Sequence, residues 1–273
     1  QDLAKDYSAI EPPTWALLLA ESCRSVGFEV GLIDANAERI SKQEVVNRIN
    51  TFDPRLVCFV VYGQNVNAGT TSMTGATELS NYIKESGVTI PICYVGSHIQ
   101  AIPTKTLKEE PSIDFGLTNE GVYALRNVLA EPDIDINNMH HIRGIVWRKN
   151  GVPTINPTER VVPANRMDID LPGYAWDLLP YDEKPLDLYR APFWHAEYDQ
   201  DKRSPYAAIQ TSLGCQFACE FCMINIINRN DDDEIGIAGN YSLMRYWSPE
   251  FIIKEFDKLV ELGVETIKIT DEM

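Results

Sequence analysis

One pattern recurs through the first 130 residues: an amphipathic helix, then a glycine, then a short apolar strand. Trp15, Leu18 and Cys23 fall at helical spacing, and Gly27 follows them as a helix-ending residue. Strands that alternate with helices are joined by βαβ crossovers, so the pattern predicts an α/β fold with a parallel sheet. The expected strands are Phe28–Asp34, Leu56–Tyr62, Ile90–Gly96 and Ile113–Leu117, and the expected helices lie near Trp15–Val26, Val45–Ile49, Thr74–Glu85, Thr104–Glu109 and Gly121–Leu129.

The chain changes character after residue 131. Two apolar stretches, Ile142–Lys149 and Val152–Asn156, flank Asn150-Gly151, which is a strong hairpin signal. A proline-rich and acidic stretch follows, which we interpret as a connector with local structure. The strand-helix pattern then resumes with a strand at Tyr206–Thr211, a helix capped by Ser248, and a strand at Val264–Thr270.

These changes divide the chain into three predicted parts: an α/β domain at 1–131, a connector at 132–204, and the start of a second α/β domain at 205–273. A parallel α/β domain usually opens with a strand, whereas this chain opens with a helix. We therefore expect that the first strand lies upstream of Gln1 and that the second domain is truncated.

Charge excludes several classes of function. The chain has 24 Lys and Arg against 40 Asp and Glu, a net charge of −16, so it lacks the basic surface that nucleic acids and anionic membranes require. Its longest apolar runs are about seven residues, against the roughly 20 of a membrane-spanning helix. No signal peptide is visible, and we expect a cytoplasmic protein.

Three of the six cysteines lie close together, in the spacing C-x₃-C-x₂-C: Cys215, Cys219 and Cys222. Three thiolates in one loop suit a soft metal centre. Structural zinc normally takes four ligands, and the nearest histidine, His195, lies 20 residues before Cys215. A four-iron cluster bound by three cysteines leaves one iron open to substrate. The spacing alone also allows a zinc loop whose fourth ligand lies beyond Met273, or free thiols.

This segment resembles the radical SAM superfamily, whose signature is C-x₃-C-x-aromatic-C on the loop after the first barrel strand; Phe221 fills the aromatic position. The resemblance implies a [4Fe-4S] cluster on the three cysteines that binds S-adenosylmethionine (SAM), with Phe221 near the adenine. It also implies that Asp271 and Glu272, at the end of the second barrel strand, help to hold the SAM amino group. The alternative is an acidic strand end exposed to solvent.

The N-terminal part resembles the cobalamin-binding domain that precedes the radical SAM barrel in one large subgroup. The matching stretches are Glu11-Pro-Pro-Thr14, Gly27–Asp34, Gly96-Ser-His98, Thr118-Asn-Glu-Gly121 and, in the connector, Trp176–Pro180. The implied fold is a doubly wound, flavodoxin-like parallel sheet, followed by the first βαβ segment of a partial radical SAM barrel.

Ligands of a doubly wound sheet lie at the carboxyl ends of its strands. The resemblance assigns the loops there to cobalamin, through Tyr62, Gly63, Gly96, Ser97, His98, Thr118, Asn119, Glu120 and Gly121. Alternatively, the glycines are ordinary turn residues. The Asp-x-His-x-x-Gly motif of a lower cobalt ligand is absent, so we interpret His98 as a turn residue or a contact of the cofactor tail.

The resemblance implies a cobalamin-dependent radical SAM enzyme that cleaves SAM reductively at its cluster and transfers a methyl group to an unactivated centre. It implies a small-molecule or natural-product substrate and an electron donor such as flavodoxin or ferredoxin. Two alternatives stay open. One is radical rearrangement or cyclisation without methyl transfer, and the other is a non-catalytic cobalamin-binding protein with a structural metal loop.

Overall fold

The computed structural model describes residues 10–62, 69–180, 189, 206–217, 219, 222 and 244–271. Their contacts divide the chain into two compact units. The first unit comprises the described residues of Gln1–Ile40, Met167–Leu213 and Arg245–Met273, and the second those of Ser41–Arg166 and Gly214–Met244. Each unit is made of segments that are not consecutive in the chain. The boundaries expected after residues 131 and 204 instead divide the chain into consecutive domains, and they stay predictions.

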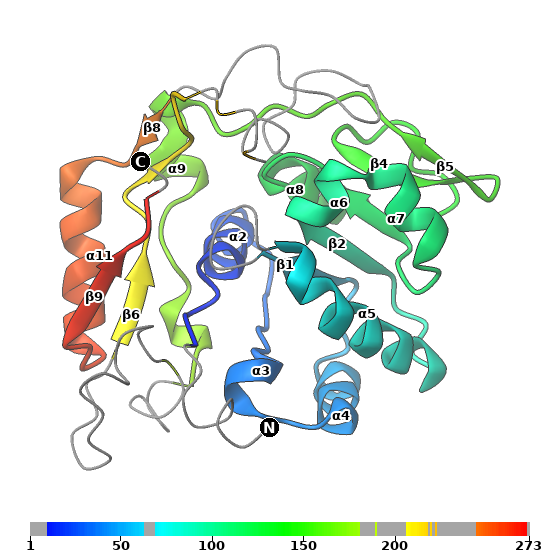
Figure 1. Ribbon diagram of the computed structural model, residues 1–273, viewed down its shortest axis with the longest axis horizontal. Helices are drawn as coiled ribbons and strands as arrows, with labels where there is room; N and C mark the ends of the chain where they lie inside the picture. Colours follow the sequence, from blue (N-terminus) through cyan, green and yellow to red (C-terminus); the bar gives the residue numbers. More distant parts are fainter. Residues whose placement is uncertain are drawn as a thin grey trace. The chain divides into compact units, whose positions relative to one another are not determined.

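The second unit contains a five-stranded sheet in the order β1-β2-β3-β4-β5 (Figure 1). β1 (Val57–Val61), β2 (Ile92–Gly96) and β3 (Phe115–Leu117) are parallel, and Val57 is in register with Ile92. All residues of β2 and β3 are buried, which explains their uninterrupted apolar sequence. The expected α/β class with parallel strands is confirmed.

The hairpin extends this sheet. β4 (Ile145–Lys149) runs antiparallel to β3, and β5 (Val152–Ile155) runs antiparallel to β4. Asn150 and Gly151 both have positive φ, at 51° and 81°, as the predicted tight turn requires. The sheet is therefore mixed, and the residues that the sequence places in a connector complete one edge of it.

Two helices of the second unit begin where the sequence provides a start signal. The Ser41 side chain accepts a hydrogen bond from Glu44 N at 3.1 Å and caps α4 (Lys42–Phe52). Pro103 is the first residue of α7 (Pro103–Glu109). The other helices are α5 (Gly69–Glu85), α6 (Ser97–Ala101) and α8 (Val122–Ala130), and a short 3₁₀ turn, η2, covers Ala164–Arg166.

The first unit contains two parallel strands, β6 (Tyr206–Ile209) and β9 (Thr266–Ile269), as expected for the start of a barrel. In the chain, β6 and β9 are separated by α11 (Pro249–Glu261) and by a short antiparallel pair, β7 (Ser212–Leu213) and β8 (Arg245–Tyr246). The Ser248 hydroxyl accepts from Phe251 N at 3.2 Å, which confirms the predicted cap. The remaining elements are α2 (Thr14–Arg24), α3 (Ala35–Glu38), α9 (Met167–Asp170) and η3 (Trp176–Leu178).

The strand expected at Phe28–Asp34 is wrong. The segment is irregular, and most of its residues are half-buried or exposed. A strand forms only where a neighbour supplies the other half of the hydrogen-bond ladder, and no described strand pairs with this segment. Asp34 instead caps α3, where its carboxylate accepts from Ala37 N at 3.1 Å.

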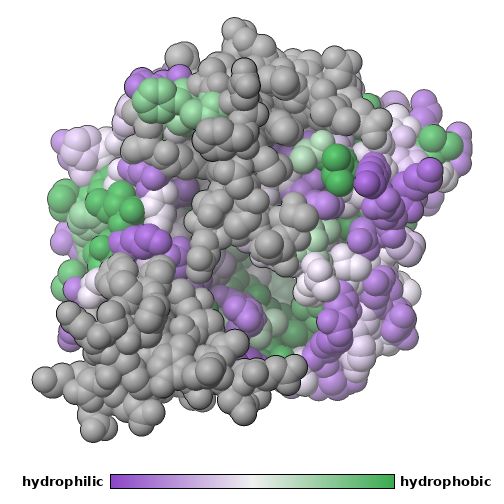
Figure 2. Space-filling view, in the orientation of Figure 1, coloured by the Kyte–Doolittle hydropathy of each residue, from purple (hydrophilic) through white to green (hydrophobic). Residues whose placement is uncertain are grey.

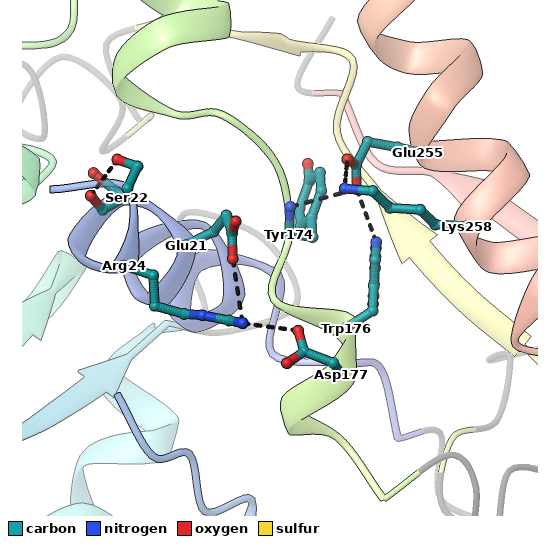
Figure 3. Close-up of polar contacts among 9 residues, drawn as sticks. Glu21, Ser22, Arg24, Tyr174, Trp176, Asp177, Glu255 and Lys258 are labelled. Atoms are coloured by element: carbon teal, nitrogen blue, oxygen red, sulfur yellow. Dashed lines mark hydrogen bonds and ion pairs between the residues drawn. The ribbon is translucent and has the colours of Figure 1, made fainter. Parts of the chain in front are cut away.

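Residues 167–180 form part of the interior of the first unit. Met167, Leu171, Tyr174 and Trp176 are each at most 2% exposed. The Ser22 hydroxyl of α2 donates to the Asp170 carbonyl at 2.8 Å, and the Trp176 indole donates to the Glu255 carboxylate of α11 at 3.0 Å (Figure 3). These residues therefore link α2 to α11.

α11 also presents apolar side chains to solvent. Ile253 and Val260 are 57% and 66% exposed, and Figure 2 shows apolar surface on the side where Figure 1 places α11. Leu259 of the same helix is fully buried. Across the described part of the chain, every helix is too short or too polar to span a bilayer.

Candidate functional site

The carboxyl ends of β1, β2 and β3 bring several of the predicted cofactor residues together. Tyr62 follows β1, Ser97 follows β2 and Asn119 follows β3. Gln100 on α6 connects two of these loops, because its Nε2 atom donates to the Tyr62 hydroxyl at 3.0 Å and to the Asn119 carbonyl. The three strand ends therefore form one edge with a shared polar network, where a parallel α/β sheet binds its ligands.

Three buried polar atoms at this edge have no hydrogen-bond partner among the described residues: Ser97 Oγ, Gln100 Oε1 and Asn119 Oδ1. Their side chains are 0%, 0% and 3% exposed. A buried polar group without a partner costs about 1–3 kcal/mol, so such groups normally have a ligand or an ordered water. The edge thus presents two amide oxygens, which are acceptors, and one hydroxyl, which can donate or accept.

Gln100 was not among the predicted site residues. The prediction ended at His98, because the matching stretch Gly96-Ser-His98 ends there. A signal was present in the sequence, since Gln100 is the one polar residue in the run Ile99–Ile102. A buried amide within an apolar helical turn needs a specific partner.

The backbone conformation and the packing of these loops explain why glycine occurs at positions 96 and 121. Gly96 has φ of 151°, and a Cβ atom there would lie 2.0 Å from the carbonyl oxygen of Val61. Gly121 precedes α8 with φ of 77°, and a Cβ atom there would lie 2.9 Å from Val95 Cγ2. The alternative reading as turn and packing residues therefore accounts for both glycines.

The loop after β3 is anchored to the chain that follows β5. Thr118 N donates to the Gly144 carbonyl at 2.8 Å, and Asn119 Nδ2 donates to the Glu159 carbonyl at 2.8 Å. The Glu120 carboxylate accepts from Val162 N at 3.1 Å and is 5% exposed. Glu120 thus has a structural partner, whereas Asn119 keeps one free acceptor.

His98 lies in the first turn of α6 and is half-buried. Burial is the main cause that lowers the pKa of its imidazole below the usual value, against smaller opposing effects of Glu110 and Glu109. The ring is therefore neutral at neutral pH. Gly63, the other predicted residue of these loops, lies outside the described residues.

The second candidate site is the cysteine loop that follows β7. Cys215 is buried, Cys222 is half-buried and Cys219 is exposed, and all three are free thiols. Cys222 N donates to the Cys219 carbonyl at 3.0 Å. The described residues contain no group of three side chains placed to hold a metal ion, so the three sulfurs are not gathered here. The donor set fits an iron-sulfur cluster by its chemistry alone.

Asp271 follows β9, and its carboxylate contacts the turn that leads into the cysteine loop. It accepts from Thr211 N at 2.6 Å and from Ser212 N at 3.1 Å. The Thr211 hydroxyl donates to its other oxygen. Phe221 and Glu272, the other residues predicted to contact SAM, lie outside the described residues.

Comparison with protein families gives a match to the N-terminal part of the chain. Residues 2–129 match the family described as B12 binding domain. The edge described above lies within these residues. Cobalamin carries primary amides around its corrin ring, whose N–H groups are donors. The unpaired oxygens of Gln100 and Asn119 are acceptors, so the residues present fit this cofactor.

Two curated relatives match nearly the whole chain. An uncharacterized methyltransferase of Pyrococcus horikoshii is 26% identical over 262 residues, which is 96% of this chain and 49% of that protein. An anaerobic magnesium-protoporphyrin IX monomethyl ester cyclase of Synechocystis is 23% identical over 267 residues, which is 96% of this chain and 45% of that protein. This chain therefore spans about half the length of the relatives it matches.

The fold is also similar to part of a solved enzyme. The radical S-adenosylmethionine methyltransferase TsrM from Kitasatospora setae, in a structure with cobalamin and a [4Fe-4S] cluster bound, has a TM-score of 0.60 and 17% identity. The match covers 97% of this chain and 47% of that one. Together with the match to the B12 binding domain and the curated relatives, it confirms the resemblance to cobalamin-binding radical SAM enzymes.

Proposed function

We propose that this chain, a relative of the cobalamin-binding radical SAM enzymes, is the cofactor-binding part of one of them and that the enzyme transfers methyl groups. One observation carries the proposal: a match to the B12 binding domain at 2–129 and a C-x₃-C-x₂-C loop behind a buried parallel strand, β6, occur on the same chain. A storage protein with a structural metal would need neither a barrel strand beside its cysteines nor an open iron.

In this proposal Ser97, Gln100 and Asn119 bind cobalamin. The two amide oxygens accept from the amide N–H groups of the cofactor, and the Ser97 hydroxyl supplies a donor or an acceptor. The Tyr62 hydroxyl orients the Gln100 amide, because it accepts from Nε2 and so directs Oε1 away from itself. Gly96 allows the ends of β1 and β2 to stay in register at this edge, because it has no Cβ atom to meet the Val61 carbonyl.

Cys215, Cys219 and Cys222 would hold the [4Fe-4S] cluster, while Phe221 and Glu272 would contact SAM beside it. When bound, these groups supply one-electron cleavage of a sulfonium bond, and cobalamin supplies a methyl carrier. The chain's own contribution is to present three thiolates on a single loop. In this proposal the loop, which follows β6 and β7 in the chain, lies at the carboxyl edge of the barrel strands, where barrel enzymes carry out their chemistry.

For the substrate of the whole protein we propose only a chemical class. TsrM has been solved with tryptophan as its substrate and a SAM analogue bound. We propose a small-molecule or natural-product substrate here as well. The electron for SAM cleavage would come from a small donor protein such as flavodoxin or ferredoxin, and we expect the enzyme in the cytoplasm.

Radical cyclisation without methyl transfer is a second candidate, since one relative is an anaerobic cyclase. The two candidates differ in the products they make from SAM. Methyl transfer leaves S-adenosylhomocysteine, whereas radical cleavage alone leaves 5′-deoxyadenosine.

The test incubates the anaerobically reconstituted protein with cobalamin, SAM and a chemical reductant, and both products are measured. We expect both products. S-adenosylhomocysteine should require cobalamin, and 5′-deoxyadenosine should be lost in Cys219→Ala. Formation of 5′-deoxyadenosine alone would favour the cyclase candidate, and formation of neither product would contradict both.

A further inference from the structure

We propose that Asp271 is a positioning residue that fixes the start of the cysteine loop, and that it acts through Thr211 and Ser212 rather than as a ligand of SAM. The role of the cysteine loop in this inference rests on the proposed function. The evidence for the inference is the set of hydrogen bonds that Asp271 makes. Three donors converge on one carboxylate: Thr211 N, Ser212 N and the Thr211 hydroxyl.

The position of Asp271 follows from the strand register. Ile209 of β6 is in register with Ile269 of β9, and Thr270 N donates to the Ile209 carbonyl at 2.8 Å. Asp271 and Thr211 both lie two residues beyond that pair. The backbone ladder between the two strands ends there, and the carboxylate continues it by accepting the next two backbone N–H groups of the β6 side.

Other contacts also hold this turn, residues 210–213, in place. The Tyr174 hydroxyl accepts from Gln210 N and lies 3.0 Å from the Gln210 carbonyl, to which it donates. Ser212 pairs with Tyr246 in the β7–β8 ladder. Asp271 is thus one of several groups that hold residues 210–213, and Cys215 follows after Gly214, which turns the chain with φ of 94°.

The occupied lone pairs argue against a primary role in binding the SAM amino group. Oδ1 of Asp271 already accepts two N–H groups, and Oδ2 accepts the Thr211 hydroxyl. A carboxylate oxygen offers about two lone-pair sites, so Oδ1 is full and Oδ2 keeps one. A neutral amide at position 271 could still accept both backbone N–H groups, whereas it would bind an ammonium ion less well than a carboxylate does.

The experiment measures alkylation of Cys215 by N-ethylmaleimide in the full chain before any metal is added, with mass spectrometry of the Cys215 peptide as the readout. Because Cys215 is buried, its alkylation reports opening of the loop. We expect Asp271→Ala to accelerate alkylation by about tenfold or more and Asp271→Asn to remain within about twofold of the wild type. Glu265→Gln, at an exposed carboxylate just before β9, is the matched control and should leave the alkylation rate unchanged.

SAM affinity of the reconstituted protein is the second readout. The proposal predicts that Asp271→Asn retains SAM affinity. Unchanged alkylation in Asp271→Ala, or a loss of SAM affinity of about tenfold or more in Asp271→Asn, would overturn it. If Asp271→Ala does not fold, the SAM affinity of Asp271→Asn decides the question alone. If the wild type takes up no iron, the proposed function fails, and the alkylation rates still decide the role of Asp271.

Discussion

The indole Nε1 of Trp176 donates a hydrogen bond to the Glu255 carboxylate at 3.0 Å, across 79 positions of sequence. Glu255 is 1% exposed, and the same carboxylate receives Lys258 Nζ at 2.7 Å and Tyr174 N at 3.4 Å (Figure 3). A buried carboxylate with three donors fixes the connector against α11. The connector in turn fixes the end of β6 through Tyr174.

Glu255→Ala should therefore destabilise the first unit. The change leaves the Trp176 indole and Tyr174 N without an acceptor, and we expect a loss of about 2–4 kcal/mol in the free energy of unfolding. Urea unfolding followed by tryptophan fluorescence measures it. Lys258→Met is the comparison variant: it keeps the acceptor of the Trp176 indole and of Tyr174 N, so we expect a smaller loss than in Glu255→Ala. Equal losses in both variants would show that the ion pair, and not the indole, carries the effect.

Ser97→Ala should lower cofactor affinity without lowering the stability of the cofactor-free protein. The Ser97 hydroxyl is buried and unpaired without the cofactor, so its removal should leave the unfolding free energy of the cofactor-free protein unchanged or raise it by up to about 1 kcal/mol. The affinity for hydroxocobalamin, measured by absorbance titration, should fall by about three- to tenfold. A destabilised variant with normal cobalamin affinity would remove Ser97 from the site.

Gln100→Leu tests the residue that the sequence did not reveal. Leucine has nearly the volume of glutamine but cannot accept from the cofactor or donate to Tyr62 and Asn119. We expect cobalamin affinity to fall by about tenfold or more. Tyr62→Phe, which removes only the hydroxyl that orients Gln100, should show a smaller loss. If Gln100→Leu binds cobalamin like the wild type while Ser97→Ala does not, Gln100 Oε1 does not contact the cofactor.

Gly96→Ala should prevent correct formation of the sheet. A Cβ atom there would lie 2.0 Å from the Val61 carbonyl oxygen, and neither backbone can move without breaking the β1–β2 register. We expect a loss of more than about 3 kcal/mol, with cobalamin binding lost as a consequence. Gly87→Ala is the matched control, because Gly87 also has a positive φ but its Cβ would meet nothing within 4 Å. That variant should lose only about 1 kcal/mol.

The sequence predicted the repeated elements well, because their signals are local. Apolar runs mark β1, β2 and β3, and Ser248 with Pro249 marks the start of α11. The strand at Phe28–Asp34 was wrong because strand formation depends on a partner, and composition does not reveal whether a partner is there. The hairpin was predicted from Asn150-Gly151, but its position beside β3 is a tertiary contact with no local signal.

The candidate site shows the same limit. Position in the sequence identified Ser97 and Asn119, since both follow strands whose ends must meet at one edge. It could not distinguish Asn119, which keeps a free acceptor, from Glu120, whose carboxylate is bound to Val162 N. Asp271 shows the difference most clearly: the family motif suggested a cofactor contact, while the structure gives its oxygens three partners on the β6 side.

The most direct test of the central claim is the metal and sulfide content of the full chain after anaerobic reconstitution with iron, sulfide and hydroxocobalamin. The account predicts about four irons, about four sulfides and about one cobalt per chain, with the iron lost and the cobalt kept when Cys215, Cys219 or Cys222 is changed to Ala. Stoichiometric zinc without sulfide, or a chain that binds no cobalt, would contradict it.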